Sequence, residues 1–189
     1  MARGHGRRAA ALTGGVGIFP PMPHHEFKVA VTNDSIVFAS AHFIIFPGHR
    51  CERLHGHNYR TRVMVEGGLD PHAHYVFDFA ELKQLMKRLT DDLDHKVLLP
   101  LEHPNLQVRE QGDTVTVAYD GAPRYVFPKG DCALLPIPNT TVEMLAQYLA
   151  RRARAEFARA ANGAAELRAI EVEIEENFGQ SASYRESLS

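Results

Sequence analysis

The sequence predicts an α+β fold built on an antiparallel sheet, and three observations carry this prediction. Segments with apolar residues at every second position come first, which is the period of a strand with one buried face. Two segments with apolar residues three and four positions apart follow, which is the period of an amphipathic helix. A last alternating segment closes the chain, so the predicted order is β-β-β-α-(β)-α-β within 189 residues.

Three strands are predicted before the first helix. The stretch EFKVAVTNDSIVFASAHFI, residues 26–44, predicts two strands around a turn at TNDS, because apolar residues alternate on both sides of that turn. NYRTRVMVEGG, residues 58–68, predicts a third strand that ends at its two glycines. One face of this strand is expected to hold alternate residues, namely Tyr59, Thr61, Val63 and Val65.

Two helices and a last strand complete the predicted core. Residues 78–95 repeat large apolar side chains at helical spacing, and Asp78 is a suitable N-cap. Residues 140–163 predict a second amphipathic helix with Thr140 as its N-cap. ELRAIEVEIEENF, residues 166–178, alternates isoleucine and valine with glutamate, which predicts the closing strand.

Three segments lie outside this core. Residues 1–23 are basic and rich in glycine and alanine, so we expect a disordered tail before a single domain at 24–189. Residues 99–138 carry short strand-like runs separated by QGD, DGAP and PKGD, which predict a β-hairpin insertion too small for a core of its own. The polar stretch ENFGQSASY, residues 176–184, predicts a loop.

Bulk properties narrow the class of protein. The formal net charge is −2, which gives no general electrostatic case for nucleic-acid binding. No apolar run approaches the length of a membrane span, so no membrane association is expected. The two cysteines, Cys51 and Cys132, make no disulfide framework and fit a reducing compartment, so a cytoplasmic protein is expected.

Histidine is the unusual residue type, since the chain holds eleven. His55 and His57 lie two positions apart, so an extended backbone points both rings to one side, and Gly56 leaves room for a neighbouring strand or a ligand. His42 ends the preceding strand, and pairing of the two strands would complete a three-histidine set. Three protein ligands leave a fourth position open, as in catalytic zinc sites. The alternative is a surface turn that happens to be rich in imidazole.

Cys51 lies four residues before His55 and allows two interpretations. One is a fourth zinc ligand, which would close the site and make it structural. The other is a thiolate base beside the metal, where a nearby cation lowers the pKa of the thiol. Cys132 has no histidines close by in the sequence, so it is interpreted as having no role in the site.

Acidic residues elsewhere also allow two interpretations each. Asp94 and His95 form a proton relay if both side chains turn inward; otherwise His95 belongs to a helix C-terminus, where it favours the negative end of the dipole. Glu143 is either a site residue or the acidic member of a capping box with Thr140. Glu176 stands where the strand alternation ends, next to glutamates of a solvent-facing side.

Six motifs follow one another along the chain in the order FASAH, CERLHGHNY, VFDF, LDHKVLL, NTTVEMLA and EENFGQSASY. Taken together they resemble the 6-pyruvoyltetrahydropterin synthase and 6-carboxytetrahydropterin synthase family. CxxxHGHNY with the upstream FxAxH is specific, whereas each other motif is weak alone. The chain departs from the family pattern in three places. Where the family has Pro-Thr-x-Glu-Asn, this chain has TTVEM, which lacks the proline and the asparagine. Where the family has a late Glu-Thr, this chain has Glu-Asn. The connector at residues 99–138 is also longer than the family's.

The resemblance implies a zinc ion and a set of proton-transfer groups. The positions that match the family's zinc ligands are His42, His55 and His57. Cys51 matches the catalytic cysteine, a proton acceptor. Asp94 and His95 match an acid–histidine relay.

The resemblance also implies a pterin pocket shared between subunits. Glu176 matches the glutamate that anchors the amino-pyrimidine edge of the pterin, with Glu175 as the alternative register. Thr141 and Glu143 match further positions near that pocket. The implied fold is the T-fold, or tunnelling fold, in which two helices cover one face of a four-stranded antiparallel sheet. Three subunits close a barrel and two trimers stack into a homohexamer.

The implied activity is zinc-dependent conversion of 7,8-dihydroneopterin triphosphate to 6-carboxy-5,6,7,8-tetrahydropterin, with release of acetaldehyde and triphosphate, on the route to queuosine and other deazapurines. Two other reactions could use the same parts, namely formation of 6-pyruvoyltetrahydropterin and aldolase-like cleavage of the dihydroneopterin side chain. A zinc-bearing assembly module without turnover is the alternative from another class. The implied partners are a small-molecule pterin and further copies of the chain.

Overall fold

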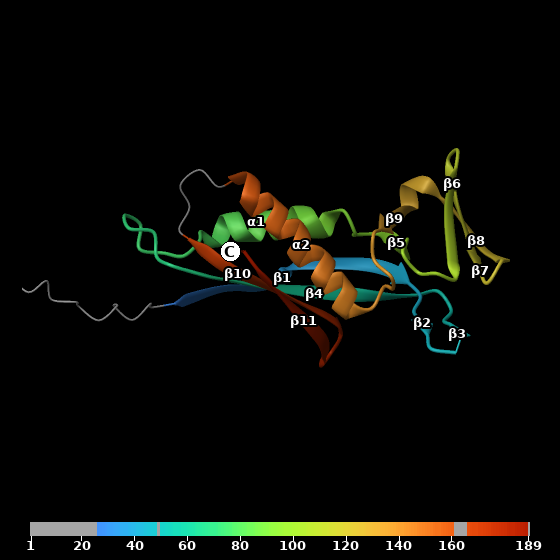
Figure 1. The fold of residues 1–189 in the computed structure, drawn as a ribbon, viewed down its shortest axis with the longest axis horizontal. Coiled ribbons are helices and arrows are strands. Elements are labelled where there is room, and N and C mark those ends of the chain that lie inside the picture. Colours follow the sequence, from blue (N-terminus) through green and yellow to red (C-terminus); the bar gives the residue numbers. More distant parts are fainter. Residues whose placement is uncertain (1–25, 49, 161–165, 189) are drawn as a thin grey trace, which may run out of the picture.

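A six-stranded mixed sheet with strand order β11-β10-β4-β1-β5-β9 forms the centre of the molecule. The structure, a computed structural model, describes residues 26–48, 50–160 and 166–188, so the tail predicted at 1–23 lies outside the described residues. Helices α1 (Phe79–Asp91) and α2 (Val142–Ala160) cover one face of the sheet (Figure 1). The strands of this sheet are β1 (Phe27–His42), β4 (His55–Gly67), β5 (Lys96–Pro100), β9 (Cys132–Leu135), β10 (Leu167–Asn177) and β11 (Gln180–Ser187).

The antiparallel part of the sheet has the four strands β11-β10-β4-β1, and β5 and β9 extend it in parallel beyond β1. Two predictions about these strands were wrong. β1 is one strand of 16 residues. The register of β1 against β4 shifts between Thr32 and Val37, so the polar TNDS stretch is accommodated as an irregularity within one strand. The predicted loop ENFGQSASY contains a tight turn at Gly179, where φ is +75°, and then the start of β11.

The two helices begin differently from one another. Asp78 caps α1 as predicted, because its side chain accepts the backbone N–H groups of Ala80 and Glu81. Thr140 does not cap α2, since its hydroxyl donates to the Phe43 carbonyl at 2.8 Å. Thr141 takes the capping position instead, and its hydroxyl accepts the Met144 N–H at 3.5 Å.

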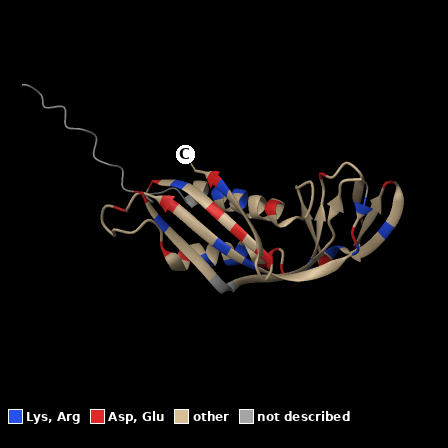
Figure 2. Cartoon of the chain, turned by 90° about the horizontal axis from the view of Figure 1, so that it is seen from below, with Lys and Arg blue, Asp and Glu red and all other residues tan. Residues whose placement is uncertain are grey.

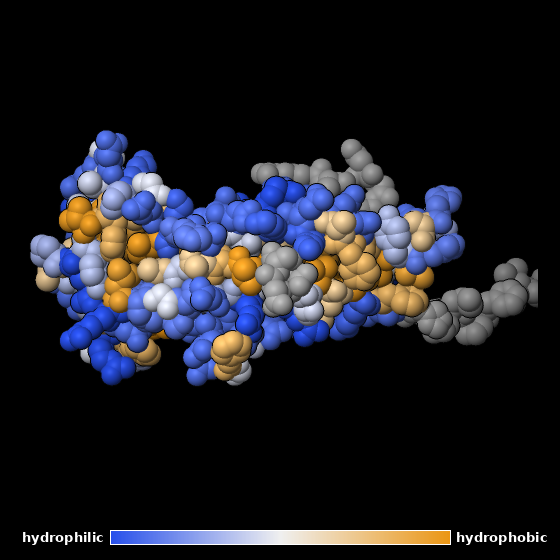
Figure 3. Space-filling view, turned by 180° about the vertical axis from the view of Figure 1, so that it is seen from behind, coloured by the Kyte–Doolittle hydropathy of each residue, from blue (hydrophilic) through white to orange (hydrophobic). Residues whose placement is uncertain are grey.

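A second, three-stranded antiparallel sheet lies between β5 and β9, within the residues predicted as an insertion. Its strands are β6 (Leu106–Gln111), β7 (Thr114–Tyr119) and β8 (Ala122–Pro128), one more than the predicted hairpin, and a 3-10 turn at Lys129–Asp131 leads on to β9. Its buried side chains form an apolar cluster with those of the domain, which we call the insertion cluster: Phe43, Ile45, Leu99, Leu106, Val115 and Val117. Hydrophobic residues also lie on the surface at this end of the molecule (Figure 3).

A short hairpin joins β1 to β4. Its strands are β2 (Ile45–Phe46) and β3 (Arg50–Cys51), and it lies at the same end of the molecule as the inserted sheet (Figure 1). Cys51 and Leu54 pack against the insertion cluster. The inserted sheet is therefore not independent of the domain, because it shares its core with this hairpin.

The two faces of the main sheet differ in chemistry. The helix-covered face holds the main core, in which Val63, Leu82 and Leu149 are fully buried. On the opposite face Arg60 and Arg62 of β4 pair with Glu175 and Glu173 of β10, so positive residues of one strand lie beside negative residues of the next (Figure 2). No helix in the described part of the chain is long and apolar enough to cross a membrane.

Candidate active site

Three imidazoles meet where β1 ends and β4 begins. The antiparallel register places His42 opposite His55 and Ser40 opposite His57. Alternation along each strand then turns all three histidines to one face of the sheet. One ring nitrogen from each lies within 4.8 Å of the corresponding atoms of the other two. The structure thus brings together the three histidines that the sequence predicted as a set.

Two backbone carbonyl groups orient these rings. Nδ1 of His42 lies 2.9 Å from the carbonyl oxygen of Thr140, and Nδ1 of His55 lies 2.9 Å from that of Arg53. A carbonyl oxygen can only accept, so each Nδ1 carries a proton and donates it, and each Nε2 keeps its lone pair. Histidines that bind metals are held in this way by their second nitrogen.

Glu176 lies against the trio. Its Oε1 is 3.1 Å from Nε2 of His42 and 3.6 Å from Nε2 of His57. Among the described residues, the buried Nε2 of His42 has no partner with hydrogen-bond geometry. A lone-pair nitrogen and a carboxylate oxygen repel each other at this distance unless a proton or a cation lies with them. The donor set therefore fits a divalent cation, and imidazole nitrogen is a ligand that zinc prefers.

The protonation of the neighbouring groups suits a cation. The close contact with the His42 imidazole holds the pKa of Glu176 below its usual range, although burial opposes this. Burial lowers the pKa of His57, the carboxylate of Glu176 opposes this, and the neighbouring His42 and His55 lower the pKa further. Burial, and then the charge of Glu176, raise the pKa of Tyr59. At neutral pH the site therefore holds a carboxylate and a neutral imidazole.

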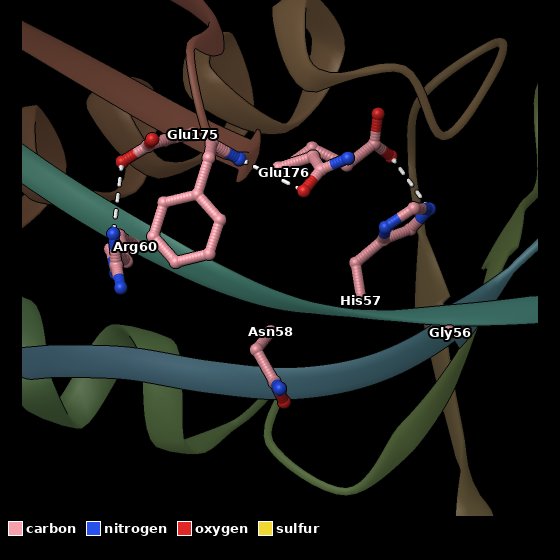
Figure 4. A pocket seen from close by; sticks show the side chains of 8 residues that line it. Gly56, His57, Asn58, Arg60, Glu175 and Glu176 are labelled. Atoms are coloured by element: carbon pink, nitrogen blue, oxygen red, sulfur yellow. Dashed lines mark hydrogen bonds and ion pairs between the residues drawn. The ribbon is translucent and has the colours of Figure 1, made fainter.

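Two cavities open beside the trio, and His57 lines both. The first has a volume of about 250 Å³ and is bounded by Glu176, Arg60 and Phe178 as well. Figure 4 shows Glu176 turned toward His57, while Arg60 reaches Glu175. The Arg60 guanidinium also lies 4.6 Å from the centre of the Phe178 ring.

The second cavity has a volume of about 470 Å³ and reaches from His57 to His95 and Asp131. His57 is the member of the trio that lines it, and His95 forms another part of its wall. Asp131 belongs to the 3-10 turn that follows the inserted sheet. The insertion therefore contributes to the border of this cavity.

Asp94 and His95 form the contact that the sequence allowed. Nδ1 of His95 is 2.9 Å from a carboxylate oxygen of Asp94, whose other oxygen accepts the Ala39 N–H at 2.8 Å. Burial opposes ionisation of Asp94, yet these hydrogen bonds hold its pKa below the usual range. The His95 side chain is 83% exposed and lines the second cavity, whereas α1 has already ended at Asp91. His95 therefore lies beyond the end of α1 and contacts Asp94, which does not fit the helix-end interpretation.

Cys51 is not a member of the three-histidine group. It packs against the insertion cluster, with its sulfur 3.7 Å from the carbonyl oxygen of Glu52. Burial raises the pKa of the thiol, and the positive charge of Arg124 opposes this. Cys51 lines neither of the two cavities. The structure therefore gives no support to a closed site with Cys51 as a fourth ligand.

Other predicted residues stand apart from the trio within one chain. Thr141 and Glu143 lie at the start of α2, where Glu143 is exposed, and neither lines the two cavities. Cys132 lies on β9, where burial raises the pKa of its thiol. Glu175 points to the charged face of the sheet, where it pairs with Arg60.

Two supporting residues were missed by sequence reasoning. Tyr59 was predicted only as a core residue, yet its hydroxyl donates to Glu176 at 3.3 Å while its ring stacks on Phe38. The signal was present, because Tyr59 stands two positions after His57 and so shares its face. The carbonyl of Thr140 could not have been found, because a backbone acceptor 98 positions away from His42 leaves no mark in the sequence.

These features define a class, namely an α+β protein with a group of three histidines suited to holding a metal ion beside two cavities. The family model for 6-pyruvoyl tetrahydropterin synthase matches residues 31–187. The chain belongs to this family, which confirms the resemblance seen in the sequence.

Relatives and solved structures agree with this assignment. The chain is 36% identical over 151 residues to a Methanocaldococcus jannaschii protein assigned as a 6-carboxy-5,6,7,8-tetrahydropterin synthase, covering 80% of this chain and 90% of that relative. A Pyrococcus horikoshii protein with the same assignment is 30% identical over 141 residues, or 74% of this chain and 80% of that relative. The 6-pyruvoyl tetrahydropterin synthase of Plasmodium vivax has a TM-score of 0.79 at 28% identity, covering 86% of this chain and 99% of that one. The Plasmodium falciparum enzyme has a TM-score of 0.78 at 30% identity, with 86% and 98% covered.

Proposed function

We propose that this protein converts 7,8-dihydroneopterin triphosphate to 6-carboxy-5,6,7,8-tetrahydropterin in a zinc-dependent lyase reaction that releases acetaldehyde and triphosphate. The observation that carries the proposal is the trio itself: its rings converge, carbonyl groups orient two of them, and His57 borders a cavity that also holds His95. The archaeal relatives assigned to this product support it. We assign the product to the synthesis of queuosine and other deazapurines.

The metal would be held by His42, His55 and His57. When bound, zinc supplies a Lewis acid that polarises substrate oxygens and acidifies the adjacent C–H bonds. Three imidazole ligands leave a position for the substrate. The buried Nε2 of His42, which has no hydrogen-bond partner among the described residues, is the observation that favours a resident cation.

We assign the proton transfers to side chains of the chain itself. Cys51, as a thiolate, accepts a proton from a side-chain carbon of the substrate. Nδ1 of His95 donates to Asp94, so Nε2 of His95 is the atom that exchanges a proton with the substrate. The fixed orientation of this imidazole by Asp94 is what makes the exchange directional.

The pterin ring would be recognised by charge and hydrogen bonding. Glu176 is the anionic acceptor that we assign to the N–H donors of the amino-pyrimidine edge, because it borders the first cavity beside His57. Glu175 is engaged by Arg60 on the charged face and does not suit this role. We assign Thr141 and Glu143 to a pocket completed by a neighbouring subunit of a homohexamer, since within one chain they stand apart from the cavities.

Product analysis tests this proposal. The purified protein is loaded with zinc and incubated with 7,8-dihydroneopterin triphosphate, and aldehydes and pterins are quantified. Acetaldehyde with 6-carboxytetrahydropterin supports the proposal. Formation of 6-pyruvoyltetrahydropterin without aldehyde, or release of glycolaldehyde, would assign one of the alternative reactions. No product from a fully metallated protein would point to a non-catalytic assembly module.

A further inference from the structure

The segment from Glu52 to Leu54 connects the thiol of Cys51 to the first histidine of β4, and side chains of the inserted sheet hold its backbone. Arg124 of β8 donates through one terminal nitrogen to the carbonyl oxygens of Cys51, at 3.3 Å, and Glu52, at 2.6 Å. The neighbouring Tyr125 hydroxyl accepts the Leu54 N–H at 3.3 Å. Two adjacent residues of the insertion thus satisfy three backbone groups of this connection.

Arg124 and Tyr125 are themselves held in place. The Arg124 guanidinium lies 5.3 Å from the centre of the Tyr125 ring, and its Nε is buried. The Tyr125 ring packs against Phe43 and Phe127 at the insertion cluster. The pair is therefore a rigid support, because its apolar side is anchored in packed side chains while its polar side meets the connection.

Charge also distinguishes Arg124. Three charged groups act on the Cys51 thiol. They are Arg124 of β8, Glu52 next to Cys51 in the sequence, and Asp120 in the turn before β8. Arg124 is the cation among them. A guanidinium offers several donors in a planar fork, which an ammonium group cannot reproduce.

We propose that the inserted sheet is a positioning device for the catalytic thiol, with Arg124 as its positioning residue. By holding the carbonyls of Cys51 and Glu52, Arg124 sets the path of the chain between the thiol and His55. Without it, two carbonyl groups lose a charge-assisted hydrogen bond and the thiol loses its neighbouring cation. The inference rests on the proposed function only in calling the thiol catalytic.

The test separates two effects of Arg124, namely holding the backbone next to Cys51 and placing a positive charge near its thiol. In a Cys132→Ser background Cys51 is the remaining thiol of the two in the chain, so its alkylation by iodoacetamide can be followed against pH without substrate. Arg124→Ala and Arg124→Lys are compared in the zinc-loaded full-length protein, with kcat, KM and zinc content measured alongside. Arg109→Ala is the matched control, because Arg109 of β6 is exposed and its guanidinium donates to the Gln107 side chain of the same strand.

We expect Arg124→Ala to raise the pH midpoint of alkylation by about one unit. We also expect kcat to fall about 10- to 100-fold, with KM and zinc content close to those of the parent. Arg124→Lys should restore the pH midpoint of alkylation but not kcat, because lysine supplies the positive charge without the planar guanidinium that holds both carbonyl groups. Arg109→Ala should match the parent in every measurement.

The proposal is overturned if a folded Arg124→Ala protein shows the parent alkylation profile, or if Arg124→Lys restores kcat fully. If Arg124→Ala does not fold, Tyr125→Phe decides, because it removes only the acceptor of the Leu54 N–H. An unchanged alkylation rate and kcat in that variant reject the proposal. Since alkylation is measured without substrate, a parent protein that releases no acetaldehyde refutes the proposed function and leaves this test intact.

Discussion

The three histidines of the candidate metal site have different surroundings, which decides how each can be tested. His42 is fully buried, and its Nδ1 links the end of β1 to the segment before α2 through Thr140. His55 is partly exposed, and its Nδ1 bonds to Arg53 only two residues away. Loss of His42 would therefore disturb packing as well as metal binding, whereas loss of His55 acts mainly on the metal.

Replacing His55 by alanine should remove both metal and turnover. The variant loses one of three ligands, so we expect bound zinc to fall from one ion per chain toward none and activity to fall at least about 100-fold. Zinc is measured by elemental analysis after dialysis, and folding by circular dichroism. His72→Ala, in an exposed loop, is the control. A fully metallated His55→Ala protein would contradict the assigned coordination.

Cys51→Ala should separate metal binding from chemistry. The thiol is not part of the three-histidine group, so zinc content should remain that of the parent. Removing a proton acceptor should lower kcat about 10²- to 10⁴-fold. Elemental analysis and steady-state kinetics on the same preparations check both statements, with Cys132→Ala as the control. Loss of zinc from Cys51→Ala would instead identify Cys51 as a ligand.

At the scale of the elements, Gly67 shows how closely β4 and β10 approach. A Cβ atom at Gly67 would lie 2.7 Å from the Glu166 carbonyl oxygen, whereas one at Gly68 would have nothing within 4 Å. Gly67→Ala must therefore shift the backbone, and we expect a loss of about 1–3 kcal/mol in the free energy of unfolding. Gly68→Ala should be neutral or slightly stabilising. Urea denaturation compares the two variants. Equal stabilities would show that the backbone around Gly67 and Glu166 can shift without loss of free energy of unfolding.

Glu66 connects three strands and should make stability depend on pH. Hydrogen bonds from Arg185 of β11, and then from Lys28 of β1, hold the pKa of Glu66 below its usual range. The ionised form is favoured in the folded state, so its contribution is complete above the unfolded pKa of about 4.3 and is lost as pH falls through the lower folded pKa. Glu66→Gln should therefore be less stable than the parent at pH 7, and the difference should shrink in acid.

Urea denaturation at a series of pH values measures this difference. Arg185→Ala is the second arm, because removing the first partner should reduce the effect of Glu66→Gln. A difference between parent and Glu66→Gln that stays constant from pH 7 to pH 3 would show that the hydrogen bonds do not act through ionisation.

The periodicity of apolar residues predicted the helices and strands that bury one face. It failed for strands that exist because they pair with a neighbouring strand. Both helices, β4 and β10 were predicted, because alternating or helical apolar patterns reflect a buried side. β11 was missed, since its small polar residues carry no such pattern and only pairing with β10 makes them a strand. β1 was divided at TNDS, because a polar run within a long irregular strand looks like a turn.

The candidate site was predictable to the extent that it follows strand alternation. His55 and His57 share a face for that reason, and the pairing of β1 with β4 adds His42. The inserted sheet at the Cys51 connection was not predictable, because contacts 72 and 73 positions apart depend on tertiary packing.

At the scale of the whole molecule, the sheet is incomplete at its edge. In the described structure β11 pairs on one side only, with β10, and its eight residues leave the other side open. Exposed edges of this length are normally covered or paired. The charged face of the sheet, on which arginines of β4 lie beside glutamates of β10, is also uncovered by any described helix (Figure 2). Both features suit closure of several sheets into a barrel of identical subunits.

The protein should therefore assemble, and activity should depend on assembly. Closure of three sheets into a barrel would pair every β11 edge, and under the proposed function two such trimers stack, so we expect light scattering to give six times the chain mass of 21.1 kDa. Thr141 and Glu143 stand apart from the cavities of their own chain, so a site that uses them needs a neighbour. Turnover per chain should fall when dilution dissociates the assembly and should return on concentration. A monomer that turns over at the full rate would show that one chain carries a complete site, and Thr141 and Glu143 would then have no part in it.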